Sequence, residues 1–199
     1  MSLFPNTKID LKLPDATVYY IPDFLVTHEA DHYFKILKNE IEWRQENITI
    51  FAKTYPQPRL TALYGIDDKS YTYSNITMHP KPFMNELLEI KSKVETELKH
   101  LFTTCLLNLY RDGNDSNGWH ADDEKELGYE PVIASISLGE ERVFQFKHKK
   151  EKQLKKSIIL KHGSLLVMQG KTQEFWKHQI PKTKKLVGPR INLTYRYIK

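Results

Sequence analysis

The sequence contains a single cysteine and no long apolar run. Cys105 stands alone among 199 residues, which excludes a disulfide framework and a cysteine-rich zinc site. The longest apolar runs, such as Leu165–Met168, are four residues long, whereas a membrane helix needs roughly 20. The opening residues carry charges and a proline where a signal peptide needs an apolar stretch. We therefore expect no membrane association and a cytoplasmic protein, nuclear if the cell is eukaryotic, that is not secreted.

Glycine is also scarce. Only 8 glycines occur, no repeat or low-complexity segment is present, and no Gly/Ser-rich linker divides the chain. Together with 12% aromatic residues, this argues against disorder and fibrous repeats. A chain of this length can bury a sizeable core. We predict a single domain over residues 1–199 and, because nothing in the sequence indicates an oligomer, a monomer.

Acidic residues are scarce only in the last quarter of the chain. Residues 146–199 carry 15 Lys and Arg against 2 Asp and Glu, whereas residues 1–145 carry 15 against 23. The basic residues cluster at 147–156 and 182–185. Such clusters are typical of a surface that binds a polyanion, but also of an ordinary solvated surface. Charge alone does not separate the two interpretations.

The apolar pattern predicts two amphipathic helices and a series of strands. The first helix follows Thr27, which can cap it, and the second begins near Pro82. Their apolar faces are Tyr33, Phe34, Leu37 and Ile41 in the first, and Phe83, Leu87, Ile90, Val94 and Leu98 in the second. Strand-like segments lie at 17–21, 47–52, 71–78, 103–110, 131–138, 142–146, 156–160, 164–168 and 190–198. This order predicts an α+β opening followed by an antiparallel sandwich or barrel.

Two of these strands carry an unusual polar face. Side chains alternate between the two faces of a strand. Four polar side chains of the last strand therefore share one side, namely Arg190, Asn192, Thr194 and Arg196. A sheet with one solvated face would explain that strand by itself. Asn108 and Tyr110, however, share a face of a strand too apolar to lie in water, and an anionic ligand would supply the polar partners they need.

A turn-rich loop at 111–118 leads into a candidate metal site. His120 and Asp122 are two residues apart in an extended segment, so their side chains point the same way. His178 follows 56 residues after Asp122. Two imidazoles and one carboxylate make the facial triad of non-haem Fe(II) oxygenases, which leaves positions open for co-substrate and oxygen. The same three residues also suit a zinc hydrolase, so the triad alone leaves the metal open.

The polar strand faces favour iron. A zinc hydrolase has no need for the faces that carry Arg190 and Tyr110. An iron enzyme that binds a dicarboxylate such as 2-oxoglutarate would use them, since one end would chelate the metal and the far carboxylate would meet Arg190 beside Tyr110. We therefore expect Fe(II), 2-oxoglutarate and O2 as cofactors.

Several short motifs then occur in a characteristic order. They are Asn108-Leu-Tyr110, His120-x-Asp122-Asp-Glu124, residues 133–139, residues 162–166, His178, and Pro189-Arg-Ile-Asn-Leu-Thr-Tyr-Arg196. In this order they resemble the AlkB family of Fe(II)/2-oxoglutarate-dependent dioxygenases, which remove alkyl groups from nucleic-acid bases. Residues 51–65 and 71–74 resemble the nucleotide-recognition lid of the subgroup that contains the human DNA repair homologues. The resemblance runs from about residue 47 to the C-terminus.

The resemblance implies a mainly β fold of the α+β class and a set of site residues. A double-stranded β-helix (jelly-roll) core at 101–199 would follow an N-terminal extension at 1–100 that holds the helices and the lid. By matching positions, His120, Asp122 and His178 would hold iron. The 2-oxoglutarate site would be lined by Asn108, Tyr110, Arg190, Asn192 and Arg196. The nucleic-acid side would comprise Phe51, Ala52, Lys53, Tyr71, Thr72, Tyr73, Asp123 and Glu124.

The implied reaction is oxidative demethylation of bases such as 1-methyladenine and 3-methylcytosine, with release of formaldehyde and succinate. These bases are cationic, so Asp123 and Glu124 would favour them over normal bases, and Tyr71 and Tyr73 would stack on an extruded base. The expected partner is alkylated DNA, single- or double-stranded, or RNA. Two alternatives stay open: the same oxygenase chemistry on RNA, a protein or a small molecule, and a binder of nucleic acid without turnover. A binder has no reason to retain the complete triad.

Overall fold

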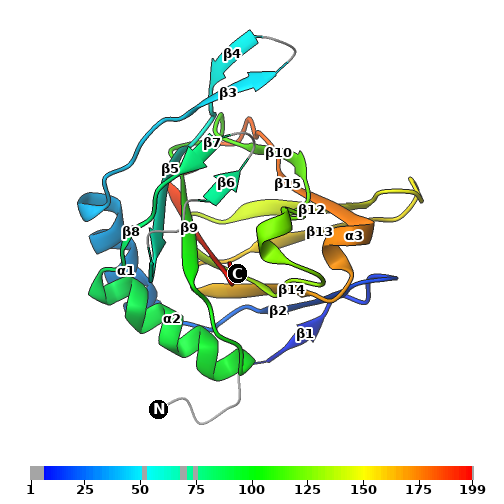
Figure 1. The fold of residues 1–199 in the computed structure, drawn as a ribbon, viewed down its shortest axis with the longest axis horizontal. Coiled ribbons are helices and arrows are strands. Elements are labelled where there is room, and N and C mark those ends of the chain that lie inside the picture. Colours follow the sequence, from blue (N-terminus) through cyan, green and yellow to red (C-terminus); the bar gives the residue numbers. More distant parts are fainter. Residues whose placement is uncertain (1–6, 51–52, 68–70, 74–75, 199) are drawn as a thin grey trace.

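One large sheet forms the centre of the molecule. The computed structural model describes residues 7–50, 53–67, 71–73 and 76–198 (Figure 1). Eight strands pair in the order β1-β2-β14-β11-β16-β9-β5-β8. Their bounds are Ile9–Asp10 (β1), Thr17–Ile21 (β2), Ser164–Gln169 (β14), Ile133–Gly139 (β11), Arg190–Arg196 (β16), Thr104–Tyr110 (β9), Leu60–Gly65 (β5) and Lys81–Pro82 (β8). Every neighbouring pair is antiparallel except β5 and β8, which are parallel.

A smaller antiparallel sheet packs against the inner face of the large one. Its strand order is β10-β15-β12-β13, with bounds Asn117–His120 (β10), Trp176–Ile180 (β15), Arg142–His148 (β12) and Lys155–Leu160 (β13). A buried apolar cluster joins the two sheets, with Leu106 and Leu166 from the large sheet and Phe144, Phe146 and Trp176 from the small one. Two sheets packed around this cluster, antiparallel except for the β5–β8 pair, confirm the predicted jelly-roll core.

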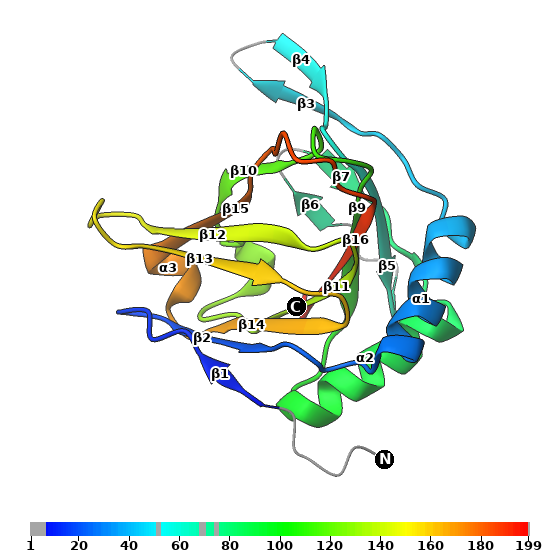
Figure 2. The ribbon, with the colours of Figure 1, turned by 180° about the vertical axis from the view of Figure 1, so that it is seen from behind.

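Two hairpins lie outside these sheets. They are β3 (Asn47–Ile50) with β4 (Lys53–Pro56), and β6 (Tyr71–Tyr73) with β7 (Ile76–Met78). In both views the β3–β4 hairpin projects from the end of the molecule at which β10 and the β6–β7 hairpin also lie (Figures 1 and 2). The strand expected at 71–78 is therefore two short strands.

The predicted helices cover the outer face of the large sheet. They are α1 (Thr27–Glu40) and α2 (Asn85–Leu98), which lie side by side in both views (Figures 1 and 2). The inward positions of the helices are fully buried, and they are Ala30, Tyr33 and Leu37 in α1 and Leu87, Ile90 and Val94 in α2. They pack on the odd-numbered residues of β16, Ile191, Leu193 and Tyr195. The polar even-numbered residues of β16 consequently point between the two sheets. No described helix is both long and apolar enough to span a membrane.

Both helix starts differ from the sequence prediction. Thr27 is not a cap: it is the first residue of α1, the N-cap is Val26, and no side chain caps the helix. The Ala30 N–H donates to the Val26 carbonyl at 3.0 Å, which places the first turn one residue earlier. α2 begins at Asn85 because Pro82 pairs with Gly65 in the large sheet.

Gly163, between β13 and β14, holds the entry to α1 against the sheet. Its carbonyl accepts from the Leu25 N–H at 2.9 Å, its own N–H donates to the Ser137 carbonyl at 2.8 Å, and its φ is +75°. A Cβ at this position would lie 2.6 Å from the Leu25 carbonyl oxygen. We expect Gly163→Ala to lower the free energy of unfolding by about 1–3 kcal/mol through backbone strain alone, with the clash adding to this. Urea unfolding measures the loss.

Gly118→Ala is the matched control for this prediction. A Cβ there would meet no atom within 4 Å. The control should change the free energy of unfolding by less than about 0.5 kcal/mol. Equal stability of the two variants would contradict the role given to Gly163.

Candidate active site

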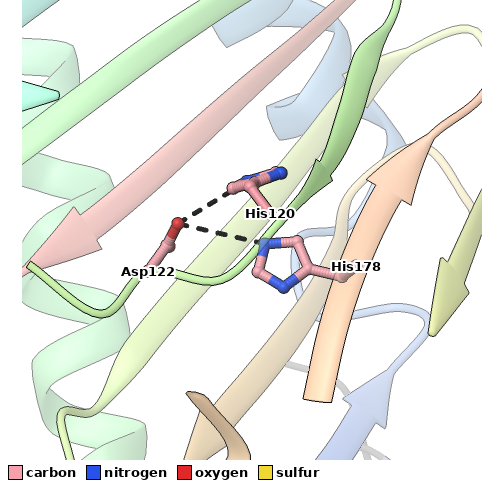
Figure 3. A group of neighbouring side chains, drawn as sticks. All are labelled: His120, Asp122 and His178. Atoms are coloured by element: carbon pink, nitrogen blue, oxygen red, sulfur yellow. Dashed lines mark ion pairs between the residues drawn. The ribbon is translucent and has the colours of Figure 1, made fainter. Parts of the chain in front are cut away.

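The three residues predicted as metal ligands lie together (Figure 3). His120 ends β10 and pairs directly with His178 on β15, and Asp122 follows β10 by two residues. Asp122 Oδ1 lies 3.6 Å from His120 Nε2 and 3.9 Å from His178 Nε2. Ligand atoms of all three residues lie within 4.8 Å of one another, and no other group of His, Cys, Asp and Glu in the described part of the chain meets that condition.

The two imidazoles are neutral near pH 7. Burial lowers the pKa of His178 to about 3, and it also lowers the pKa of His120. His120 Nδ1 donates to the Gly118 carbonyl at 2.7 Å, the only role that a carbonyl partner allows. In this tautomer Nε2, on the side of Asp122, is the unprotonated nitrogen, and it lies 3.3 Å from Asn117 Nδ2. Both rings therefore offer the neutral nitrogen that a metal ion requires.

The carboxylate of Asp122 is ionised and only half satisfied. Burial by itself raises the pKa of this carboxyl, but the Arg196 guanidinium beside it holds the pKa well below its usual range. Arg196 Nη2 donates to Oδ2 at 2.7 Å. Oδ1 is buried and meets no hydrogen-bond donor among the residues the structure describes. A buried, unpaired carboxylate oxygen between two neutral imidazoles fits a divalent cation, which would remove the cost of its burial.

Gln173 holds the backbone of Asp122 in place. It lies in α3 (Thr172–Phe175), is 2% exposed, and accepts the Asp122 N–H through Oε1 at 2.9 Å. Gln173→Leu would leave this N–H buried without a partner, so we expect the free energy of unfolding to fall by about 1–3 kcal/mol. Loss of such support should weaken metal binding by roughly 10- to 100-fold. Urea unfolding and a titration with Mn(II) measure the two effects.

The matched control makes the same change at an exposed position, Gln153→Leu. It should leave metal affinity unchanged. If Gln173→Leu binds Mn(II) as tightly as this control, Gln173 does not position the carboxylate.

The predicted co-substrate face lies in the same cavity as the triad. In the paired strands β9 and β16, Asn108 stands opposite Asn192 and Tyr110 opposite Arg190. All five residues assigned from the sequence line the cavity together with the three candidate ligands, and these five are Asn108, Tyr110, Arg190, Asn192 and Arg196. The structure thus joins two sets of residues whose members are up to 76 positions apart in the sequence.

Arg190 is buried, charged and only partly paired. It is 1% exposed, and burial lowers the pKa of its guanidinium to about 10, so it stays protonated at neutral pH. Nη2 donates to Ser137 Oγ at 2.8 Å, whereas Nε and Nη1 meet no hydrogen-bond partner in the described residues. A buried cation with free donors is costly unless an anion occupies them. Nε and Nη1 lie on different edges of the guanidinium, and each offers a charged donor to a carboxylate oxygen.

The other members of this face have protein partners. Asn192 Nδ2 donates to Ser135 Oγ at 2.7 Å and to the Ile136 carbonyl at 3.0 Å. Arg196 is bonded to Asp122, and Asn108 Oδ1 accepts from Arg59 Nε at 2.7 Å. Their hydrogen bonds hold these side chains in place in the cavity wall. Arg190, by contrast, offers a ligand charged donors that have no partner in the described part of the chain.

Two buried arginines of the site escaped sequence reasoning. Arg59, 4% exposed, bonds to Asn108 as described above. Arg142 is 3% exposed and donates to the carbonyls of Asp112, Asp115 and Pro181 at 2.7–3.0 Å, which ties the loop before β10 to the end of β15. The burial of Arg142 could have been predicted from the sequence, because Arg142 alternates with Phe144 and Phe146 on the same face of β12.

The residues expected to face nucleic acid are only partly described. Phe51 and Ala52 lie outside the described residues, and Tyr71, Thr72 and Tyr73 form β6 without described side chains. Lys53 is exposed on β4. Asp123 is 61% exposed and forms an ion pair with Lys149, with Asp123 Oδ2 3.1 Å from Lys149 Nζ, and Glu124 is half-buried.

Comparisons with known proteins agree with this geometry. A family model of the 2OG-Fe(II) oxygenase superfamily matches residues 17–196. The mouse alpha-ketoglutarate-dependent dioxygenase alkB homolog 3 is 42% identical over 192 residues, which cover 92% of this chain and 66% of that protein. The human DNA oxidative demethylase ALKBH2 is 38% identical over 180 residues, covering 85% of this chain and 69% of that protein. The chain thus spans about two thirds of the length of these relatives.

A solved structure, "The structure of OsALKBH1", shares the fold with a TM-score of 0.64 at 17% identity, covering 90% of this chain and 97% of that one. The fold and the grouping of His120, Asp122 and His178 fit a non-haem iron oxygenase. The chain belongs to the 2OG-Fe(II) oxygenase superfamily and, within it, to the AlkB family, as the resemblance implied. The cofactors of this family are the expected Fe(II), 2-oxoglutarate and O2.

Proposed function

We propose that this chain oxidatively removes methyl groups from alkylated nucleic-acid bases such as 1-methyladenine and 3-methylcytosine, releasing formaldehyde and succinate. One observation carries the proposal: a single cavity holds the metal triad and a buried arginine with two unused donors. The names of the relatives, an alpha-ketoglutarate-dependent dioxygenase and a DNA oxidative demethylase, support the choice of substrate.

The residues of the cavity would have two roles, binding the metal and binding 2-oxoglutarate. Iron with 2-oxoglutarate and O2 supplies the oxidant that hydroxylates the methyl group. His120, Asp122 and His178 would hold the metal through two neutral nitrogens and one carboxylate. Arg196 keeps the Asp122 carboxylate ionised and oriented, and Arg190 would clamp the far carboxylate of 2-oxoglutarate.

The acids beyond the triad would recognise the base. Methylation at these ring nitrogens makes adenine and cytosine cationic, and an ionised carboxylate favours a cation over a neutral base. Asp123 directly follows the candidate ligand Asp122, and its exposed carboxylate would contact the cationic base. Tyr71 and Tyr73 would stack on the extruded base, and the hairpin at 47–56 would touch the flanking nucleotides.

A row of lysines on the small sheet supports a polyanionic substrate. Lys147 on β12 stands directly opposite Lys177 on β15 and Lys155 on β13. The buried neighbours of Lys147 and Lys177 face the core, so these side chains point outward. Like charges directly opposite one another on adjacent strands are destabilising. Phosphate groups of a nucleic acid laid across the row would relieve this repulsion.

The test is a turnover assay on an oligonucleotide with one 3-methylcytosine. Formaldehyde and succinate are measured with Fe(II), 2-oxoglutarate and O2 present, and with each omitted in turn. We expect both products only when all three are present. DNA and RNA, single- and double-stranded, are compared under the same conditions. Succinate without formaldehyde would keep the oxygenase and reject the substrate; neither product, with metal bound, would favour a non-catalytic binder.

A further inference from the structure

Lys149 is a cation anchored beside the candidate recognition acid. It directly follows β12, and its backbone N–H donates to the Phe175 carbonyl at 2.7 Å. Its Nζ donates to the Gln173 carbonyl at 2.8 Å and to Asp123 Oδ2 at 3.1 Å. The side chain is only 26% exposed. Both ends of this lysine are therefore fixed, unlike those of a freely moving surface lysine.

The position of Lys149 changes what Asp123 presents to a ligand. An ammonium group at hydrogen-bond distance cancels most of the carboxylate's field at greater distances, because the two charges form a neutral pair. The free lone pairs of Asp123 can still accept a hydrogen bond. The acid thus keeps its value as an acceptor for an amino group and loses much of its preference for positive charge.

The ion pair is also accessible from outside. Asp123 and Lys149 line a cavity of about 380 Å³ with Tyr129, Lys171 and Glu174. Tyr129 is 78% exposed at its rim. The other charged residues of this cavity are Glu130, Lys171 and Glu174, so loss of the Lys149 charge would leave three carboxylates and one ammonium group there. The local charge near Asp123 therefore depends on Lys149.

We infer that Lys149 is a specificity-determining residue that narrows the enzyme's preference for cationic over neutral methylated bases. This inference rests on the proposed function and deepens it. An unpaired Asp123 would strongly favour a cationic lesion, whereas the Asp123–Lys149 pair admits neutral lesions of the same shape.

The test compares two lesions with one ring geometry. 3-Methylcytosine is cationic and 3-methylthymine is neutral, and both are placed at the same position of one oligonucleotide. The measured quantity is the ratio of kcat/KM for the cationic base to kcat/KM for the neutral base. Lys149→Met should raise this ratio by about five-fold, since the remaining carboxylate acts unopposed at a distance of several ångströms. Lys149→Arg should keep the ratio of the unchanged enzyme.

Two further variants separate the change in base preference from poor folding and from a general loss of attraction to the nucleic acid. Lys149→Gln removes the charge and retains a donor near the Gln173 carbonyl, so it should also raise the ratio even if the methionine variant folds poorly. Lys150→Met removes the same charge at the exposed neighbouring position. It should lower kcat/KM for both bases by the same factor, because it weakens only the general attraction of the polyanion.

The outcomes are distinct from failure of the proposed function. If the unchanged enzyme demethylates neither base, the proposed function fails and this inference fails with it. If the unchanged enzyme demethylates the bases, but Lys149→Met and Lys149→Gln have the same ratio of kcat/KM values as that enzyme, the inference alone is wrong. If the Lys149 variants lose kcat/KM equally on both bases and also show a higher KM for 2-oxoglutarate, Lys149 has only a structural role. That result would also overturn the inference.

Discussion

Replacing Asp122 with alanine should abolish formaldehyde release and leave nucleic-acid binding close to that of the unchanged protein. Asp122 Oδ1 faces both candidate imidazole ligands and has no other partner in the described structure. Without the carboxylate, two neutral imidazoles remain, too few to hold Fe(II) against water. The proposed nucleic-acid-binding surface lies elsewhere, on the lysine row and the hairpins. Formaldehyde release and fluorescence anisotropy with a labelled oligonucleotide measure the two properties.

This variant also removes a buried ion pair, so stability has to be controlled. Arg196 is 4% exposed and would lose its carboxylate partner, which should lower the free energy of unfolding by about 3–5 kcal/mol. Asp122→Asn keeps the volume and an acceptor for Arg196 but lacks the negative charge. It should lose turnover with a much smaller loss of stability. Sustained demethylation by the asparagine variant would rule out Asp122 as the metal carboxylate.

Replacing Arg190 with methionine should disable the use of 2-oxoglutarate without destabilising the protein. Loss of one partner of a buried, hydrogen-bonded charge pair costs about 2–5 kcal/mol of binding, so we expect KM for 2-oxoglutarate to rise on the order of 100-fold. In the absence of ligand, the same change removes a buried charge with two unused donors. The free energy of unfolding should therefore stay the same or rise. A 2-oxoglutarate titration of succinate formation and urea unfolding give both values.

Arg142→Met is the matched control, because it removes another buried arginine near the same tyrosine ring. The guanidinium carbons of Arg190 and Arg142 lie 5.3 and 5.7 Å from the centre of the Tyr110 ring. The donors of Arg142, however, are used by three backbone carbonyls. We expect this control to lose stability and to change KM for 2-oxoglutarate far less. The reverse pattern would show that Arg190 is structural and that the carboxylate binds elsewhere.

Local patterns in the sequence were sufficient to predict which residues are buried where burial depends on the periodicity of a single helix. The apolar spacing of α1 and α2 identified the residues that face the sheet, since helical periodicity places them on one side regardless of the partner. β5 was missed for the opposite reason. Five of its six residues, from Thr61 to Gly65, are buried, so it has no polar alternation to distinguish it from loop or helix.

The buried arginines mark a second limit of local reasoning. Arg59 and Arg142 bond to groups that lie 27 to 57 positions away in the sequence. Their partners are mainly backbone carbonyls, which every residue carries. A side-chain pattern therefore contains no information about which carbonyl a buried guanidinium will meet.

The sequence by itself determined which chemical groups this protein brings to its site. Alternation along one strand is a local property, so it put Arg190 and Asn192 on one face and paired His120 with Asp122. Only the tertiary structure decided which strands are neighbours and in what register: His120 opposite His178, Arg190 opposite Tyr110, and Lys149 against Asp123. Register depends on packing between segments far apart in the chain, and a shift of one residue would turn every side chain of a strand to the other face.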